Sequence, residues 1–435
     1  MADVHYHIER PSARARYALS HVLGAMAGWE AVEVSDPDRF RSVEGPKLLY
    51  GTGPVAGAFQ IIPQGLLERT DTNPVEPAMS VVDTVPVLFP GGHGNLSYDP
   101  VAGAFFLLSR YEEYGPVPRD LHGRPLTASL HGARHGYLHR PVVDEWLYVL
   151  AESWRRQDPR LPALRRTYTQ TATLDADNGA IYLGRPPWRS AGGAVRDLLR
   201  GNLQRVMDRA AVLLGSRPDP YAVHEPFLAL AQLNGAAAIV NFLVAPHGRH
   251  DHAIALGTAH MQGVLRLASA KAEVGLHPGY ASVDRPGQTK AEKQCLETAL
   301  GRPVLRSRQH FLRMHLPETY TQLAALGIRD EHSMGFHDRA GFRAGTCTPF
   351  PFFDLRSGEQ TALTVHPFAV MDSALCYKLR LSPKEAIAEA CRMADAVRHV
   401  QGRFVSVWHE RFLSGYGDEQ GWEVVAPTVL EHARP

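Results

Sequence analysis

Seven polar side chains stand at or just after the ends of predicted strands, where they could bind a metal ion and hydrolyse a substrate. They are Asp175, Asp177, His277, Arg308, His310, Arg343 and His366. In parallel α/β folds the carboxyl ends of the strands carry the functional site, so residues far apart in the sequence can converge there. Carboxylates and imidazoles together suit zinc, cobalt, nickel, iron or manganese. Such an ion activates water for hydrolysis, and a second carboxylate can accept the proton of that water.

Each of these residues also has an ordinary structural interpretation. A single aspartate after a strand is more often a helix cap or a turn residue than a ligand. Asp175 and Asp177 are two residues apart, however, which directs both carboxylates to the same side of an extended chain. The other side chains could be hydrogen-bonded structural histidines, a strand end or ion-pair partners: His277, His366, Arg308 and Arg343. The metal interpretation therefore depends on the order and spacing of the whole set.

The elements that must position this set alternate between strand and helix after residue 162. Apolar patterns predict strands over 171–175, 237–244, 274–277, 362–366 and 404–408. They predict helices over 194–214, 265–272 and 317–326, and a last helix that runs to Val400 from a capping box at Ser382 and Glu385. This alternation indicates an α/β fold with a mostly parallel sheet, either open or closed into a barrel.

The part of the chain before residue 162 mixes short strands with turns and two amphipathic helices, over 100–114 and 141–154. A turn-rich stretch at 157–162, with two prolines, separates it from the rest. We therefore predict a smaller mixed α/β domain of unknown role at 1–162 and a second domain at 163–435. The charges of 110–113 predict either a solvated helix face or an ion-pair cluster between the domains, and we favour the cluster.

Composition excludes several classes of protein. The 435 residues carry 46 Lys and Arg against 45 Asp and Glu, so no charge bias favours nucleic acid as a partner. No apolar run approaches the ~20 residues of a membrane span. Four cysteines without a CxxC pair predict a reducing compartment. Residues 17–27 faintly resemble a signal peptide, but their apolar positions form one helical stripe, so we expect a mature amphipathic helix and a cytoplasmic protein.

A run of motifs resembles a known family. The segments are 108–114, 173–178, 275–280, 307–312, 333–336, 341–345 and 367–372. Together they are similar to a divergent member of the polysaccharide deacetylase superfamily, carbohydrate esterase family four. They resemble most a bacterial branch with an uncharacterised N-terminal domain. The resemblance spans nearly the whole chain, and it implies a distorted (β/α)7-type barrel and metal-dependent removal of acetyl groups from N-acetylated sugars.

The resemblance also implies roles for individual residues. In family members with an Asp-x-Asp motif the first aspartate is the general base and the second binds the metal, which corresponds to Asp175 and Asp177. The usual second motif has two histidines four residues apart. Here His277 is present, but the position four residues later is Ala281.

A third motif of the family, Arg-x-Pro-aromatic, matches 308–311 with His310 in place of proline. We therefore expect His310 to replace the missing ligand, so that Asp177, His277 and His310 form an open three-ligand site. Arg308 would orient Asp175 and keep it ionised. Two other candidate catalytic residues are Arg343 and the family's late acid histidine, which corresponds to His366 or, less directly, to His409.

The expected function is therefore a cytoplasmic hydrolase that depends on a divalent metal, with zinc expected and cobalt, nickel, iron or manganese as alternatives. Water activated at the metal would attack the acetyl carbonyl of an N-acetylated sugar or glycan precursor. Two alternatives stay open: hydrolysis of another C–N amide, or a pseudoenzyme that binds a glycan or nucleotide sugar.

Overall fold

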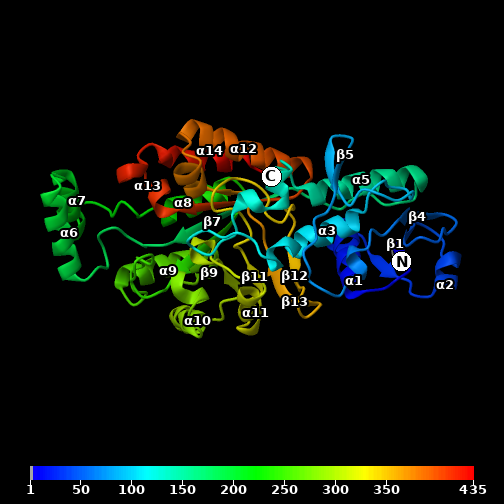
Figure 1. Ribbon diagram of the computed structural model, residues 1–435. Helices are drawn as coiled ribbons and strands as arrows, with labels where there is room; N and C mark the ends of the chain where they lie inside the picture. The colour runs from blue at the N-terminus through cyan, green and yellow to red at the C-terminus, as the bar shows by residue number, and fades with distance from the viewer. Residues whose placement is uncertain (1–2) are drawn as a thin grey trace.

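Two separate sheets organise the chain in this computed structural model, which describes residues 3–435 (Figure 1). The smaller sheet is parallel and has the order β2-β1-β3-β4. Its strands are β1 (Val4–Ile8), β2 (Ala31–Glu33), β3 (Lys47–Tyr50) and β4 (Ala58–Ile61). The same part of the chain contains α1 (Ala13–Ser20), α2 (Pro37–Ser42), α3 (Pro100–Leu108), α4 (His131–Arg134), α5 (Val142–Gln157) and a hairpin of β5 (Met79–Val82) and β6 (Val85–Leu88).

The larger sheet has nine strands in the order β12-β13-β11-β10-β9-β8-β7-β15-β14. They are β7 (Thr169–Ala176), β8 (Ala237–Leu243), β9 (Glu273–His277), β10 (Arg306–Ser307), β11 (Asp330–Glu331), β12 (Phe350–Asp354), β13 (Glu359–Val365), β14 (Val370–Met371) and β15 (Arg403–His409). The accompanying helices are α6 (Pro187–Leu199), α7 (Leu203–Leu213), α8 (His224–Leu233), α9 (Ala259–Lys271), α10 (Gln288–Leu300), α11 (Glu318–Ala325), α12 (Pro383–His399), α13 (Glu410–Ser414) and α14 (Val425–His432). The fold is thus mixed α/β, as predicted.

The sheet does not close into the expected seven-stranded barrel. Within residues 3–435 its edge strands β12 and β14 pair only with β13 and β15, and β12 runs antiparallel to β13. The N-terminal part covers the β12 edge instead. Phe350, Phe352 and Phe353 of β12 belong to the same buried core as residues of α1 and α3, and the Tyr17 hydroxyl donates to the carbonyl of Pro351 at 2.7 Å. An edge that is covered in this way is protected without barrel closure.

Most elements lie where the apolar patterns predict them, but two predicted helices are shorter. The predicted helix over 194–214 is wrong, because α6 ends at Leu199 and Gly201 adopts a φ of 70° before α7 begins. A glycine in this left-handed conformation ends a helix at little cost. The predicted helix over 100–114 ends at Leu108, since Arg110 has a φ of 53°.

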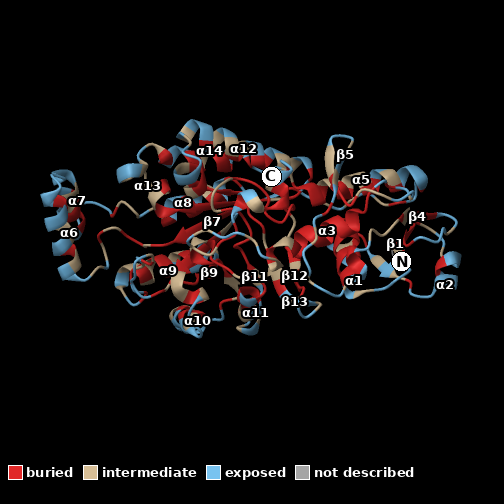
Figure 2. Cartoon of the chain, viewed as in Figure 1, coloured by how far each residue is buried: buried red, intermediate tan, exposed pale blue. Residues whose placement is uncertain are grey.

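The central strands are buried on both faces (Figure 2), which is typical of a parallel sheet covered by helices. All residues of β7 after Thr169 are buried. In the N-terminal part, the predicted helical stripe of Leu19, Val22, Leu23 and Met26 is also buried. Among residues 3–435 no helix is long and apolar enough to span a membrane.

A buried cluster of charges joins the two parts of the chain, as the charges of 110–113 predicted. The Arg343 guanidinium donates to both carboxylate oxygens of Glu113 at 3.0 and 2.7 Å, and Arg110 donates to the same carboxylate at 2.9 Å. Burial raises the pKa of Glu113, but the two guanidinium groups outweigh it and lower that pKa to about 2. The carboxylate therefore stays ionised inside the protein.

Replacing Glu113 with glutamine is expected to lower the free energy of unfolding by about 3–5 kcal/mol at neutral pH, because the buried Arg343 loses its anionic partner and the buried Arg110 keeps only Glu112. Glu113 contributes this stability above its unfolded pKa near 4.5, and the contribution is lost as the pH falls through about 2. Urea unfolding at several pH values measures both effects. In the matched control Glu152→Gln, which breaks an exposed pair with Arg156, the change should stay within about 0.5 kcal/mol. Equal effects of the two variants would contradict a structural role for the cluster.

Candidate active site

Strand register brings the first residues of the site together. On β7, Asp175 lies directly beside His409 of β15 on one side and Asn241 of β8 on the other. On the next strand, His277 of β9 lies beside Leu243 of β8. Asn241 needs the glycine opposite it, because a Cβ on Gly275 would come within 2.2 Å of its Oδ1. Residues separated by more than 200 positions therefore meet at the carboxyl ends of adjacent parallel strands.

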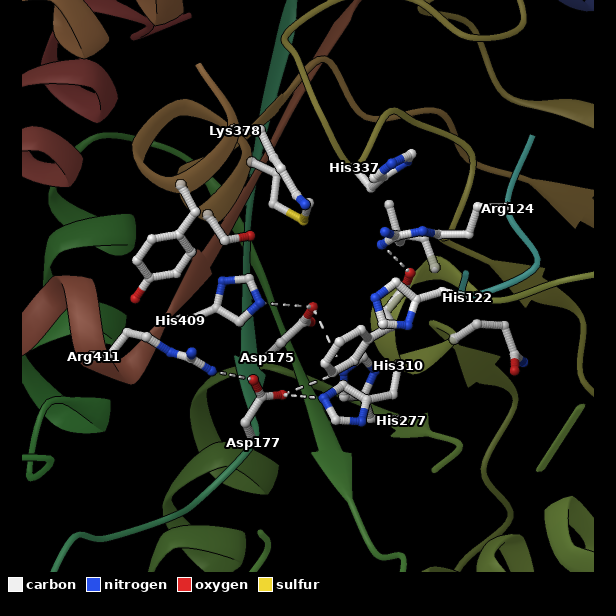
Figure 3. Close-up of a pocket in the computed structure, with 16 residues that line it drawn as sticks. His122, Arg124, Asp175, Asp177, His277, His310, His337, Lys378, His409 and Arg411 are labelled. Atoms are coloured by element: carbon white, nitrogen blue, oxygen red, sulfur yellow. Dashed lines mark hydrogen bonds and ion pairs between the residues drawn. The ribbon is translucent and has the colours of Figure 1, made fainter. Parts of the chain in front are cut away.

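Asp177, His277 and His310 form a group whose ligand atoms all lie within 4.8 Å of one another (Figure 3). The Nε2 atoms of His277 and His310 are 3.4 and 3.7 Å from Oδ1 of Asp177. All three side chains are buried. Burial raises the pKa of Asp177, but the neighbouring histidines outweigh it and hold that pKa well below its usual range. The carboxylate is therefore in its metal-binding form.

The hydrogen bonds around this group fit a metal ion. Nδ1 of His277 is 2.5 Å from the carbonyl of Arg308, and Nδ1 of His310 is 2.8 Å from the Asp251 carboxylate. When Nδ1 donates to an oxygen, the Nε2 lone pair is free to bind a metal. Oδ1 of Asp177 is buried and has no hydrogen-bond partner within residues 3–435. Two nitrogen lone pairs and one unpartnered carboxylate oxygen thus face one point, the donor set that zinc prefers.

A second group of possible ligands, Glu76, His131 and His135, differs in this respect. The Glu76 carboxylate pairs with both terminal nitrogens of Arg134, at 2.7 and 2.8 Å. Both ring nitrogens of His131 are engaged, one with the Tyr137 hydroxyl at 2.6 Å and the other with the Pro77 carbonyl at 3.0 Å. Neighbouring protein groups therefore satisfy Glu76 and His131 without an ion.

Asp175 is held next to the Asp177 group but is bound differently. Its Oδ1 accepts from Arg308 at 2.8 Å and from Asn241 at 2.9 Å. Its Oδ2 lies 3.9 Å from Nε2 of His277 and 4.0 Å from Nε2 of His409. Burial raises the pKa of Asp175, but the Arg308 guanidinium and the two imidazoles outweigh it, so the pKa is lowered. The Asp175 carboxylate is thus ionised, with Oδ1 fixed by hydrogen bonds and Oδ2 between two imidazoles.

His409 lies across the pocket from the two histidines of the group (Figure 3). Its Nδ1 is 2.6 Å from Oδ1 of Asp372, and its backbone N–H donates to the other oxygen of that carboxylate at 2.7 Å. Burial lowers the pKa of His409, but the carboxylates of Asp372, Asp177 and Asp175 outweigh burial and raise that pKa to about 9. The imidazole is therefore protonated at neutral pH.

Two of the residues selected from the sequence lie away from this pocket. His366 follows β13, on the far side of β11, where its Nε2 is 2.8 Å from Asp330 and its ring stacks on His332. Arg343 forms an ion pair with Glu113 in the buried cluster described above. The other five, Asp175, Asp177, His277, Arg308 and His310, come together. For His366 the distance has a simple cause: several strands separate β13 from β7 in the sheet.

Other residues that line the pocket or support its side chains escaped the sequence analysis. Asp251, Asp372 and Asn241 orient site residues, and Arg411 donates to Oδ2 of Asp177 at 3.0 Å. Arg411 follows His409 by two residues, which is the one signal that could have indicated it. The N-terminal part also reaches the pocket with His122 and Arg124, which line it. The cavity has a volume of about 180 Å³, enough for a small acyl group and water.

Comparison with known proteins adds the following. Residues 4–159 match a family of unknown function (DUF7033). No curated protein matches the sequence. The fold is similar to that of a putative polysaccharide deacetylase from Mycobacterium smegmatis, with 16% identity and a TM-score of 0.39, over 62% of this chain and 84% of that one. It is also similar to the polysaccharide deacetylase Bc1974 from Bacillus cereus, with 10% identity and a TM-score of 0.31, over 62% and 87% of the two chains. At these values the likeness says nothing about the chemistry, which has to follow from the side chains of the site.

Proposed function

We propose that this protein is a metal-dependent hydrolase that removes the acetyl group of an N-acetylated sugar or glycan precursor, as a divergent member of the polysaccharide deacetylase superfamily. One observation carries the proposal. The buried Asp177, His277 and His310 group lies in the same pocket as an ionised carboxylate, Asp175, and a protonated imidazole, His409. Amide hydrolysis needs a base for the attacking water and an acid for the leaving amine.

Asp177, His277 and His310 would hold the ion, and zinc fits these donors best. A divalent ion bound there supplies Lewis-acid polarisation of the acetyl oxygen and lowers the pKa of water. Arg411 fixes the second oxygen of Asp177, so that Oδ1 is the atom left for the ion.

The protein's own groups then move two protons. Asp175 accepts the proton of the attacking water on Oδ2, while Arg308 and Asn241 hold Oδ1 still. The oxygen of the water bonds to the acetyl carbon, the C–N bond breaks, and His409 gives its proton to the departing nitrogen. Asp372 orients the His409 ring and favours its charged form until that transfer. Acetate and the free amino sugar are the products.

Two alternatives have a weaker basis. The pseudoenzyme hypothesis came from Ala281 in place of a second histidine, but His310 supplies an imidazole to the same group. Hydrolysis of another C–N amide uses the same residues, and only the substrate assay separates it. We also propose a cytoplasmic location, since Cys295, Cys347, Cys376 and Cys391 are all free thiols.

Replacing His409 with glutamine is expected to lower kcat for N-acetyl hydrolysis by ~10²–10⁴-fold while metal content stays unchanged, because the amine leaves without a proton donor. The rival acid is tested in parallel as His366→Gln, which should stay active. Hydrolysis of p-nitrophenyl acetate provides the internal control. Its leaving group needs no proton, so His409→Gln should lose little of this activity. If only His366→Gln fails on the amide, the acid is His366.

A further inference from the structure

A second cavity is lined by the residue that follows Asp177 in the chain. Asp177 lines the pocket, and the next residue, Asn178, lines a cavity of about 510 Å³ between the body of the protein and the α6–α7 hairpin. Figure 1 shows this hairpin standing apart from the rest of the chain. We call the space the arginine cavity, because Arg185, Arg189, Arg196, Arg205 and Arg209 line it.

The arginine cavity has an excess of positive charge. Asp197 is the one carboxylate among its described lining residues, and it is already paired with Arg209 at 2.7 Å. His247 and His252 also line the cavity. Burial together with nearby positive groups lowers the pKa of both, which favours their neutral form, so they add no negative charge to balance the arginines. Cations gathered at a partly enclosed surface attract an anion.

Arg185 donates to the backbone carbonyls of Ile181 and Ala180, whereas other arginines of the cavity keep donors that no described residue accepts. Nε of Arg209 is buried and has no hydrogen-bond partner within residues 3–435. Its guanidinium packs against the Tyr182 ring at 4.7 Å, and a Cβ on Gly193 would come within 2.7 Å of it. In the described chain, the guanidinium groups of Arg189 and Arg196 form no hydrogen bond to another residue. Planar guanidinium forks with free donors match the oxygens of phosphate.

We propose that the arginine cavity binds the phosphate or diphosphate group of the substrate. This deepens the proposed function and rests on it, since the acetylated sugar would then lie in the catalytic pocket while its phosphate ester lies next to Asn178. The substrate class is an N-acetylated sugar linked through phosphate to a carrier. A neutral glycan offers nothing to pair with these arginines.

The surface beside the cavity favours a lipid carrier. Eight of the sixteen exposed large apolar residues of the described chain lie in this hairpin: Trp188, Val195, Leu198, Leu199, Leu203, Met207, Leu213 and Leu214. On α6, Trp188, Val195 and Leu199 share one helical face, and Arg189 and Arg196 occupy the adjacent face that lines the cavity. Figure 2 shows how little of the hairpin is buried.

Charge decides between a lipid surface and a second copy of this chain on that apolar face. Both aspartates of the hairpin, Asp197 and Asp208, are paired with arginines. A second copy would therefore bring more unpaired cations against the first, whereas an anionic lipid surface brings their counter-charge. Apolar contact combined with basic side chains is the usual pattern of helices that lie on such a surface.

Isothermal titration with pyrophosphate tests the phosphate site. The wild-type protein should bind it, with an affinity that falls as salt is raised. The double variant Arg189→Gln/Arg196→Gln removes two charges and breaks no side-chain hydrogen bond, and we expect it to bind at least about tenfold more weakly. Arg302→Gln, an exposed arginine outside the cavity, should bind as the wild type does. Unchanged binding by the double variant overturns the proposal, because the pyrophosphate would then sit elsewhere, for example on a catalytic metal.

Vesicle sedimentation and UDP binding identify the kind of carrier. Sedimentation with phosphatidylcholine vesicles containing phosphatidic acid should capture the wild type but neither the arginine double variant nor Leu199→Gln/Leu214→Gln. The leucine variant should still bind pyrophosphate. If UDP binds and the vesicles do not, the carrier is water-soluble and the lipid part of the inference fails. Pyrophosphate binding without any deacetylase activity would instead overturn the proposed function and leave the phosphate site standing.

Discussion

Replacing His310 with alanine is expected to remove the divalent metal from the purified protein nearly as completely as His277→Ala does. Both imidazoles direct Nε2 at Oδ1 of Asp177, and both have Nδ1 engaged with an oxygen. Loss of one ligand out of three leaves too few donors for tight binding. Metal content after dialysis, measured by elemental analysis, gives the result directly.

The matched control is Asp251→Asn. This side chain contacts His310 and orients its ring without belonging to the three-ligand group. Removing such a supporting partner typically weakens metal binding by ~10–100-fold only. We therefore expect the order wild type, Asp251→Asn, His310→Ala in metal affinity. Full metal content in His310→Ala would contradict the three-ligand site and leave His310 as a substrate contact.

Asp175→Asn is expected to keep its metal and lose ~10²–10⁴-fold in kcat, because an amide cannot accept the proton of the attacking water. Asp177→Asn should instead lose the metal, since a neutral amide is a poorer ligand than a carboxylate. The two aspartates are alike in burial and only two residues apart, so each variant is the control for the other. Metal content, melting temperature and deacetylation rate are measured on both.

The melting temperature separates chemistry from folding. Asp175 pairs with the fully buried Arg308, so its neutralisation should also lower stability. If Asp175 were only a turn or cap residue, its loss would cost ~0.5–2 kcal/mol of stability and leave the rate unchanged. A fully active Asp175→Asn protein would therefore exclude Asp175 as the base.

Local patterns in the sequence were enough to predict the parallel sheet and part of the candidate site. Strand–helix alternation predicted the parallel sheet, and the positions of Asp175, Asp177 and His277 at strand ends predicted that they would meet. Adjacent parallel strands bring their carboxyl ends to one edge, so this inference needs no knowledge of the loops. The capping box at Ser382 was also predicted and is present, because its hydrogen bonds join residues only three positions apart.

Tertiary structure decided the rest, because it depends on which strands become neighbours. His366 ends one predicted strand and His409 directly follows another, and only the strand order puts β15 beside β7 and β13 several strands away. Arg343 could not be assigned from its own surroundings, since its partner Glu113 lies 230 residues earlier in the chain.

Barrel closure is a second feature of this kind. The sheet stays open and the N-terminal part packs on its β12 edge, a long-range contact that no local pattern contains. The arginine cavity depends on the break at Gly201, which divides one predicted helix into the two helices of the hairpin that lines this cavity. Residue types and their spacing thus determined the chemistry available to this protein, and long-range packing determined which of its residues take part.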